Sequence, residues 1–254
     1  MNQTSKQTIQ PTNYGALGTL VTVFFFWGFI AASNSIFIPF CKTHFELTQF
    51  ESQLIGSAFY VAYFVGSLAL FLASNVLGYD IINKIGYKKG IIYGLWISVA
   101  GALLIIPSAN ANSFPAILAS FFVVALGFSL QQTAAQPFAI ALGDPSTGSH
   151  RLNMGGSVNS FGTTLGPIIV SFFLFGSVGG DVKEVTVTNI NTLYMIVAAV
   201  FAAVALFFTF SKLPAGISES KVEKENKASA SLLVMTGLIV ATIVIGMLTE
   251  VPKF

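Results

Sequence analysis

Residues 16–40 read ALGTLVTVFFFWGFIAASNSIFIPF, a stretch without a single charged side chain. About 20 consecutive apolar residues suffice for a helix to cross a bilayer, so this stretch predicts a transmembrane helix. Over the whole chain of 254 residues, 54% are hydrophobic and 9% are charged, with a mean hydropathy of +0.78. Soluble domains carry about 25% charged residues. The composition therefore predicts an all-α membrane protein, because so few charges cannot cover a surface that faces water.

The same criterion predicts six further hydrophobic helices. They cover roughly residues 53–76, 89–107, 114–142, 151–177, 190–211 and 231–249. The segment before the last of them is rich in Lys and Glu, which is typical of a solvated linker. The expected organisation is an N-terminal segment (1–15), a six-helix unit (16–211), a charged linker (212–230) and a truncated seventh helix (231–254).

Basic residues predict the orientation, because cytoplasmic loops of membrane proteins are enriched in Lys and Arg. With a cytoplasmic N-terminus and the helices predicted above, nine of the twelve basic residues face the cytoplasm and three face the other side. The first residues lack the apolar core and the cleavage site of a secretory signal, so we expect no cleavage. The N-terminus and the linker are both expected on the cytoplasmic side.

The first and fourth predicted helices share a pattern that indicates an internal repeat. Gly-Phe, a polar cluster and Pro-Phe follow one another at 28–40 and again at 127–138. Units that lie an odd number of spans apart must be oppositely oriented, as in the inverted repeats of transporters. We therefore expect a 3+3 inverted repeat, with chance similarity as the alternative because Gly and Phe are abundant here.

The first six predicted helices contain amides but no carboxylate at mid-membrane depth. All ten Asp and Glu residues and both histidines fall in loops, in the linker or near the end of the seventh helix. Proton relays need titratable groups inside the membrane. Amides donate and accept hydrogen bonds, as sugar hydroxyls do. The intramembrane amides include Asn34 in the first helix, Gln131, Gln132 and Gln136 in the fourth, and Asn153 and Asn159 in the fifth.

Helical spacing groups some of these residues into candidate sugar-binding faces. Trp27 and Asn34 are seven residues apart, so an indole and an amide share one stripe of the first helix. Gln132 and Gln136 are four apart and share a face of the fourth helix. The alternative is that these amides only bond neighbouring helices, as is common in membranes. The predicted substrate-binding residues are Gln132, Asn159, Asn34, Trp27 and Gln136.

Glycines in the fifth predicted helix indicate close packing. Gly155, Gly162 and Gly166 lie on the same stripe as Asn159. Gly162 and Gly166 form a small-xxx-small pair, which allows two helix backbones to approach each other. We expect these glycines to serve packing and not chemistry.

Motifs for catalysis or cofactors do not occur in the sequence. No phosphate-binding or dinucleotide-binding glycine pattern is present, and a single cysteine excludes a cysteine-based metal cage. A net charge of +2 with scattered basic residues gives no indication of nucleic acid. We therefore predict no enzyme activity, no cofactor and no metal site.

Several motifs together resemble the fucose–galactose–glucose:proton symporter family of the major facilitator superfamily, especially its glucose/galactose transporters from Bacteroidetes-type bacteria. They are FFFWGF at 24–29, SAFY and YF within 57–64, KIGYKK at 84–89, QTAAQP at 132–137, and RLN and NSFG within 151–162. The resemblance runs from about residue 18 to 213. It implies the six-helix N-terminal half of a twelve-helix fold, with the sugar bound between two halves.

The resemblance also implies a function. A member of this family moves a hexose (glucose, galactose or fucose) across the inner membrane by alternating access. The expected partners are the sugar, the lipid bilayer and a missing C-terminal half. The alternative is a sugar sensor or membrane scaffold that keeps the fold without transporting.

This sequence departs from the family at the positions associated with proton coupling. The family pattern has an Asp in helix one and a Glu in helix four, where this chain has Ser35 and Gln132. The Gln-x-x-Asn pattern of helix five reads Gly156-x-x-Asn159, so only the Asn carries over. We therefore expect sugar binding without proton coupling through this half.

Overall fold

The computed structural model describes residues 10–175, 186–214, 237–238 and 241, without the side chains of 33–36 and 173–175. The chain divides into two compact units, Met1–Ser218 and Glu219–Phe254. The description below concerns the first unit. The predicted linker at 212–230 and the predicted seventh helix at 231–249 fall almost entirely outside the described residues.

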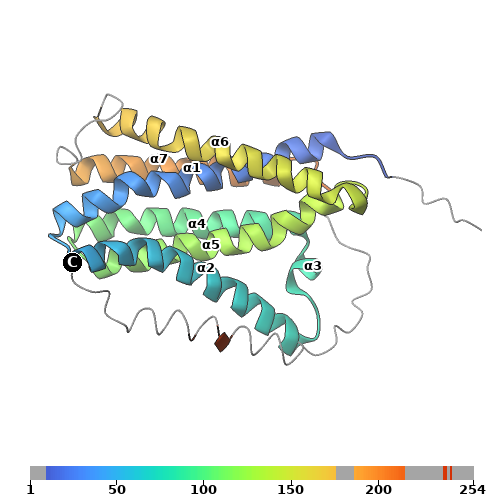
Figure 1. The fold of residues 1–254 in the computed structure, drawn as a ribbon, viewed down its shortest axis with the longest axis horizontal. Helices are drawn as coiled ribbons and strands as arrows, with labels where there is room; N and C mark the ends of the chain where they lie inside the picture. Colours follow the sequence, from blue (N-terminus) through green and yellow to red (C-terminus); the bar gives the residue numbers. More distant parts are fainter. Residues whose placement is uncertain (1–9, 176–185, 215–236, 239–240, 242–254) are drawn as a thin grey trace, which may run out of the picture. The chain divides into compact units, whose positions relative to one another are not determined.

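The described part of the first unit is helical and contains no strand (Figure 1). Six long helices correspond to the first six helices predicted from hydropathy, which confirms the all-α prediction for this part of the chain. In chain order the elements are α1 (Tyr14–His44), α2 (Gln49–Leu77), α3 (Ile81–Ile85), α4 (Tyr87–Asn110), α5 (Phe114–Ala141), the 3-10 helix η1 (Pro145–Thr147), α6 (Gly148–Phe175) and α7 (Val187–Phe210).

Capping groups explain why most helices extend beyond the apolar stretches. The Asn13 side chain accepts a hydrogen bond from the backbone N–H of Ala16 at 3.0 Å and starts α1. Thr48 and Glu51 form a reciprocal capping box at the start of α2. Thr186 begins α7 in the same way. Gly78 ends α2 with a φ of 72°, a left-handed conformation that glycine adopts without strain.

Five of the long helices are long and apolar enough to cross a membrane: α1, α2, α4, α5 and α7. The helix α6, which covers most of the predicted span 151–177, is not among them. Its first half carries a series of hydroxyl, amide and glycine residues in place of aliphatic side chains. α6 is therefore the polar helix of an otherwise apolar unit.

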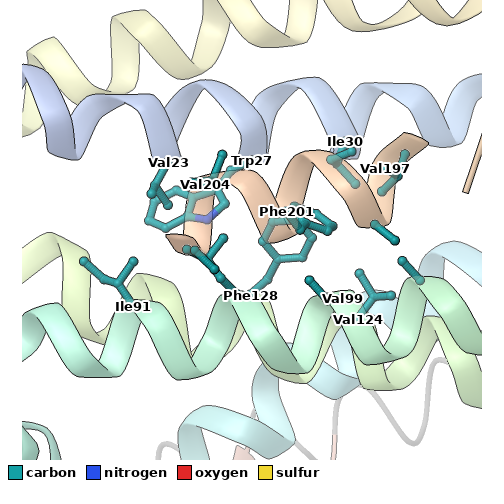
Figure 2. Packing of buried hydrophobic residues seen from close by; sticks show 14 of the residues in the cluster. Val23, Trp27, Ile30, Ile91, Val99, Val124, Phe128, Val197, Phe201 and Val204 are labelled. Atoms are coloured by element: carbon teal, nitrogen blue, oxygen red, sulfur yellow. The ribbon is translucent and has the colours of Figure 1, made fainter. Parts of the chain in front are cut away.

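The helices pack as two groups within this unit. α1 packs most extensively on α6, whereas α4 packs on α5 and α7, and α2 rests on α5. Large side chains fill the space between the groups. In Figure 2, Val23 and Ile30 of α1 point toward Phe201 and Val204 of α7 and Phe128 of α5. All five side chains are buried.

Candidate functional site

Trp27, the first predicted sugar-binding residue, lies inside the helix bundle. Its indole is only 5% exposed, and its Nε1–H donates a hydrogen bond to Oε1 of Gln131 at 2.9 Å. The Phe24 ring lies against it, with ring centroids 4.6 Å apart. The indole thus faces α5 within this unit, and its role in sugar binding stays a prediction.

Gln131 continues this contact into α4. The amide is fully buried, and its Nε2 donates to Oγ of Ser98 at 3.0 Å. The Ser98 hydroxyl in turn donates to the carbonyl oxygen of Val124 at 3.2 Å. Each polar group on Trp27 and Gln131 therefore has a partner, as burial in lipid requires. The sequence predicted Gln131 as an intramembrane amide but gave no reason to single it out.

Asn159 joins α6 to α1. Its Nδ2 donates to the backbone carbonyl oxygen of Phe24 at 3.0 Å. A carbonyl can only accept, so this bond sets the orientation of the amide and directs Oδ1 away from Phe24. Oδ1 has no protein donor among the described residues, and the side chain is half-buried. Asn159 therefore offers an oriented acceptor next to the α1–α6 contact.

The predicted glycine packing is confirmed at this contact, which we call the α1–α6 seam and define by Gly28, Gly162 and Gly166. A Cβ added at Gly28 would lie 2.0 Å from the carbonyl oxygen of Asn159. One added at Gly162 would lie 2.1 Å from the carbonyl oxygen of Phe25. The two backbones touch here, which only glycine permits.

Gln132 and Gln136 lie together on α5, one turn apart. Nε2 of Gln136 donates to Oε1 of Gln132 across 3.4 Å, a long hydrogen bond. Gln132 is half-buried and Gln136 is exposed. The Nε2 group of Gln132 has no acceptor among the described residues, so Gln132 offers a donor. Asn34 and Ser35 lie in α1, but their side chains are outside the described part of the chain.

A polar face of α6 extends on both sides of Asn159. Ser157 and Ser160 are exposed, and their hydroxyls donate to carbonyl oxygens one turn earlier, at 2.9 and 3.0 Å. Thr163 and Thr164 do the same at 3.1 and 3.0 Å. Because the helix itself satisfies these donors, the face remains compatible with a membrane while it keeps lone pairs for a partner or solute.

Arg151 joins the end of α5 to the start of α6. The guanidinium, 3% exposed, donates to the carbonyl oxygens of Ala139, Ile140 and Asp144 at 2.6–2.8 Å. It therefore caps the end of α5 from the start of α6 and satisfies carbonyls that the helix leaves free. The sequence indicated Arg151 only as one of the basic residues that predict the orientation and as part of a family motif. Its capping of the carbonyls at the end of α5 was not predicted.

Lys88 makes the equivalent contact at the end of α7. Its Nζ donates to the carbonyl oxygens of Thr209 at 3.1 Å and Ser211 at 2.8 Å. Cations favour helix C-termini because of the helix dipole. Arg151 and Lys88 thus both act as structural caps in this unit.

The described residues contain a cavity of about 260 Å³ between the start of α1 and the segment after α7. None of the predicted sugar-binding residues lines it. Its lining consists of Asn13, Gly15, Ala16, Thr19, Ser211, Lys212 and Leu213. No group of three His, Cys, Asp or Glu residues that could hold a metal occurs among the described residues.

Known proteins match this chain over most of its length. A glucose/galactose transporter of Brucella abortus is 32% identical over 231 residues, which cover 91% of this chain and 54% of the relative. The L-fucose-proton symporter of Escherichia coli is 32% identical over 229 residues, 84% of this chain and 50% of that protein. The chain spans about half the length of the curated relatives it matches.

A solved structure and a family model agree with these relatives. The crystal structure of FucP, a major facilitator superfamily transporter in the outward conformation, superimposes with a TM-score of 0.67 at 30% identity. The match covers 87% of this chain and 56% of that protein, in its N-terminal half. The model of the Major Facilitator Superfamily matches residues 17–254. The chain is thus a multi-pass membrane protein that belongs to the Major Facilitator Superfamily.

Proposed function

We propose that the protein moves a hexose across the inner membrane by alternating access, with this six-helix unit as one of two halves. The observation that carries the proposal is a pair of amides with complementary free groups. Asn159 on α6 presents an acceptor oxygen, because its Nδ2 is held by the Phe24 carbonyl. Gln132 on α5 presents a donor, because its oxygen already accepts from Gln136. A sugar carries several hydroxyls, each of which accepts and donates, so it can bond to both groups.

The neutral character of these groups supports a neutral substrate. Unpaired charges are expensive in a membrane, and a charged substrate needs an opposite charge or a helix dipole near it. Gln132 and Asn159 carry no charge. Relatives at 32% identity are named glucose/galactose transporter and L-fucose-proton symporter, which supports a hexose as the substrate class.

Proton coupling through this half is not part of the proposal. Ser35 and Gln132 stand where the family pattern has acids. Neither side chain gains or loses a proton near neutral pH, so neither can carry a proton across the membrane during the transport cycle. We propose uniport, or coupling through groups elsewhere in the full-length protein.

The arrangement in the membrane is also proposed. The N-terminus is cytoplasmic, as the distribution of basic residues favours. The six-helix unit spans 16–211, and 212–230 is a cytoplasmic linker to a further hydrophobic helix at 231–254. The orientation can be tested with Lys6→Cys and Lys183→Cys, each as the only cysteine, labelled from either side of the membrane. Cytoplasmic accessibility at position 183 would contradict it.

Hexose uptake by the full-length protein in proteoliposomes tests the main proposal. Radiolabelled glucose, galactose and fucose are supplied with and without a pH gradient. We expect saturable uptake of at least one hexose, and a loss of about tenfold or more in kcat/KM for Gln132→Leu and for Asn159→Leu. Asn153→Leu is the matched control, because this amide on α6 is exposed and its side chain makes no hydrogen bond to the described residues.

Three results would contradict parts of this proposal. Sugar binding without uptake would favour the alternative of a sensor or scaffold. Uptake that alkalinises the medium, and continues to do so after the acids of the second half are replaced, would contradict the proposal on coupling. Absence of both binding and uptake would remove a hexose as the substrate class.

A further inference from the structure

The two amides that are proposed to bind the sugar belong to different helix groups. Asn159 lies on α6, which packs mainly on α1. Gln132 lies on α5, which packs mainly on α4. Direct contact between the two groups is much narrower than contact within either of them. A sugar that bonds to both amides therefore bridges the groups, and its affinity depends on how they are held against each other.

Most of the interface between the two helix groups cannot fix how one group is positioned against the other. It is formed by large apolar side chains, including Val23, Ile30, Phe201 and Val204 (Figure 2). Dispersion contacts are individually weak and non-directional, and lipid offers no hydrophobic force that favours one register. By contrast, α1 and α6 are in backbone contact at the α1–α6 seam, so they form one closely packed pair.

A directional contact crosses this interface at Trp27. The Trp27 Nε1–H to Gln131 Oε1 bond, 2.9 Å long, joins α1 to α5 between two residues that are 5% and 0% exposed. A hydrogen bond weakens steeply when its distance or angle changes. Without water to replace either partner, separation would leave two buried polar groups unsatisfied. We call this contact the indole–amide bond.

The acceptor of the indole–amide bond is itself held rigidly. Gln131 Nε2 donates to Ser98, which donates to the carbonyl oxygen of Val124. The Gln131 side chain also lies against Gly94, where an added Cβ would meet its Cγ at 2.6 Å. The amide is therefore fixed to the α4–α5 pair, and a fully satisfied network of this kind gives a unique geometry.

The same bond reaches Asn159 through one residue of α1. The Phe24 ring lies against Trp27, and the Phe24 carbonyl oxygen accepts from Asn159. Gln131, on the other side, directly precedes Gln132 in α5. Each end of the indole–amide bond is thus connected to one of the two sugar-binding amides.

We propose that Gln131 is a positioning residue for sugar recognition, which through the indole–amide bond sets the separation of Asn159 and Gln132. This inference rests on the proposed hexose transport and adds a residue that does not touch the sugar. Trp27 accordingly acts through Gln131 and not by stacking on the sugar ring.

The test is hexose uptake by the full-length protein with Gln131→Met, which keeps a similar volume and removes both polar atoms. We expect the hexose KM to rise by about tenfold, the scale of one lost buried hydrogen bond, with kcat changed by less than about twofold. The matched control is Ser120→Ala. Ser120 bonds to Ser108 at 3.1 Å in the same α4–α5 contact without reaching α1, so its loss leaves KM unchanged.

Trp27→Phe and the double variant complete the test. Trp27→Phe keeps an aromatic ring and removes the donor together with part of the indole, so it covers the case in which Gln131→Met does not fold. If Trp27 acts through Gln131, the variant that carries both Trp27→Phe and Gln131→Met raises the hexose KM no more than the single variant with the larger effect. If Trp27 binds the sugar directly, the two effects add, and that result overturns the inference.

A fluorescence measurement separates this inference from the proposed function. The emission of Trp27 can be observed alone in a background in which Trp96 and every tryptophan of the missing half are replaced by Phe. We expect Gln131→Met to shift that emission, and bound hexose to shift it only in the protein with Gln131. Wild-type uptake with an unchanged KM in Gln131→Met overturns the inference alone. Absence of wild-type uptake overturns the proposed function, and the inference with it.

Discussion

Helix α1 has two interfaces of opposite character within the same bundle. Toward α6, it presents Gly28 and backbone carbonyls, and the helices touch along their main chains. Toward α5 and α7, it presents large side chains with the indole–amide bond among them. The first interface has no room for an added atom. The second can repack its apolar side chains. Away from the start of α1, where the Asn13 N–H donates to the Leu142 carbonyl oxygen, its directional contact is the indole–amide bond.

This difference separates stability from function in testable terms. Substitutions at the α1–α6 seam should lower the stability of the fold, because an added side chain would separate the two helix backbones. Changes in the apolar interface should cost little stability. Of the contacts that α1 makes, the indole–amide bond is the one whose loss should alter sugar affinity more than stability.

The largest effect is expected for Gly162→Ala in α6. The added methyl group would lie 2.1 Å from the carbonyl oxygen of Phe25, which the backbone cannot move easily. We expect the free energy of unfolding to fall by about 3 kcal/mol or more, at the upper end of overpacking effects. Unfolding of the full-length protein in a detergent titration measures this change.

Gly156→Ala provides the matched control on the same helix. No atom lies within 4 Å of a Cβ built at Gly156, so alanine is accommodated there and has the higher helix propensity. We expect no loss of stability for this variant. Equal losses at Gly156 and Gly162 would show that the α1–α6 seam is not the cause.

The second largest effect is expected at Arg151, where α5 of one helix group meets α6 of the other. Arg151→Met removes the donors to Ala139, Ile140 and Asp144, and leaves one buried and two partly buried carbonyls without this partner. We expect a loss of about 2–3 kcal/mol, as for other hydrogen bonds to charged groups. Detergent unfolding of Lys89→Met, which removes an exposed basic residue, should give no comparable loss. A similar loss in both variants would attribute the effect to net charge.

Arg151 also shows where sequence reasoning stops. Hydropathy alone predicted six helices that the structure contains, because about 20 apolar residues have few alternatives in lipid. The ends of those helices depend on caps such as Asn13 and Thr48, which lie outside the apolar stretches. The carbonyls that Arg151 caps belong to the preceding helix, and no local pattern marks them.

The candidate site divides in the same way. The small-xxx-small pair in α6 predicted close packing correctly but could not identify Phe25 of α1 as the partner. The sequence predicted Gln131 as an intramembrane amide, but its hydrogen-bond partner Trp27 lies 104 positions away in the chain. Helical periodicity places residues on a face, whereas the choice between packing and substrate binding depends on which helix covers that face.

The apolar interface gives a smaller expected effect. Ile30→Val removes one methylene group from a side chain that is 9% exposed and faces α7 (Figure 2). We expect a loss of about 1 kcal/mol. The hexose KM should not change, in contrast to Gln131→Met. A rise in KM for Ile30→Val, measured by uptake in proteoliposomes, would mean that apolar packing also sets the position of the two sugar-binding amides.

The smallest effect concerns Asp144, in the loop that joins the two groups. Hydrogen bonds from the Ser146 hydroxyl and backbone N–H lower the pKa of this carboxyl from its ordinary value of 3.8, with a smaller contribution from Arg151. A lowered pKa in the folded state means that the ionised form stabilises the fold above the ordinary value, and that this contribution is lost as pH falls through the lowered pKa. Ser146→Ala removes one of the two donors. The difference in melting temperature between wild type and Ser146→Ala should therefore be small at neutral pH and vanish below the lowered pKa. A difference that stays constant across this range would show that Ser146 acts through packing, and that the joint between the two helix groups depends on the Arg151 cap alone.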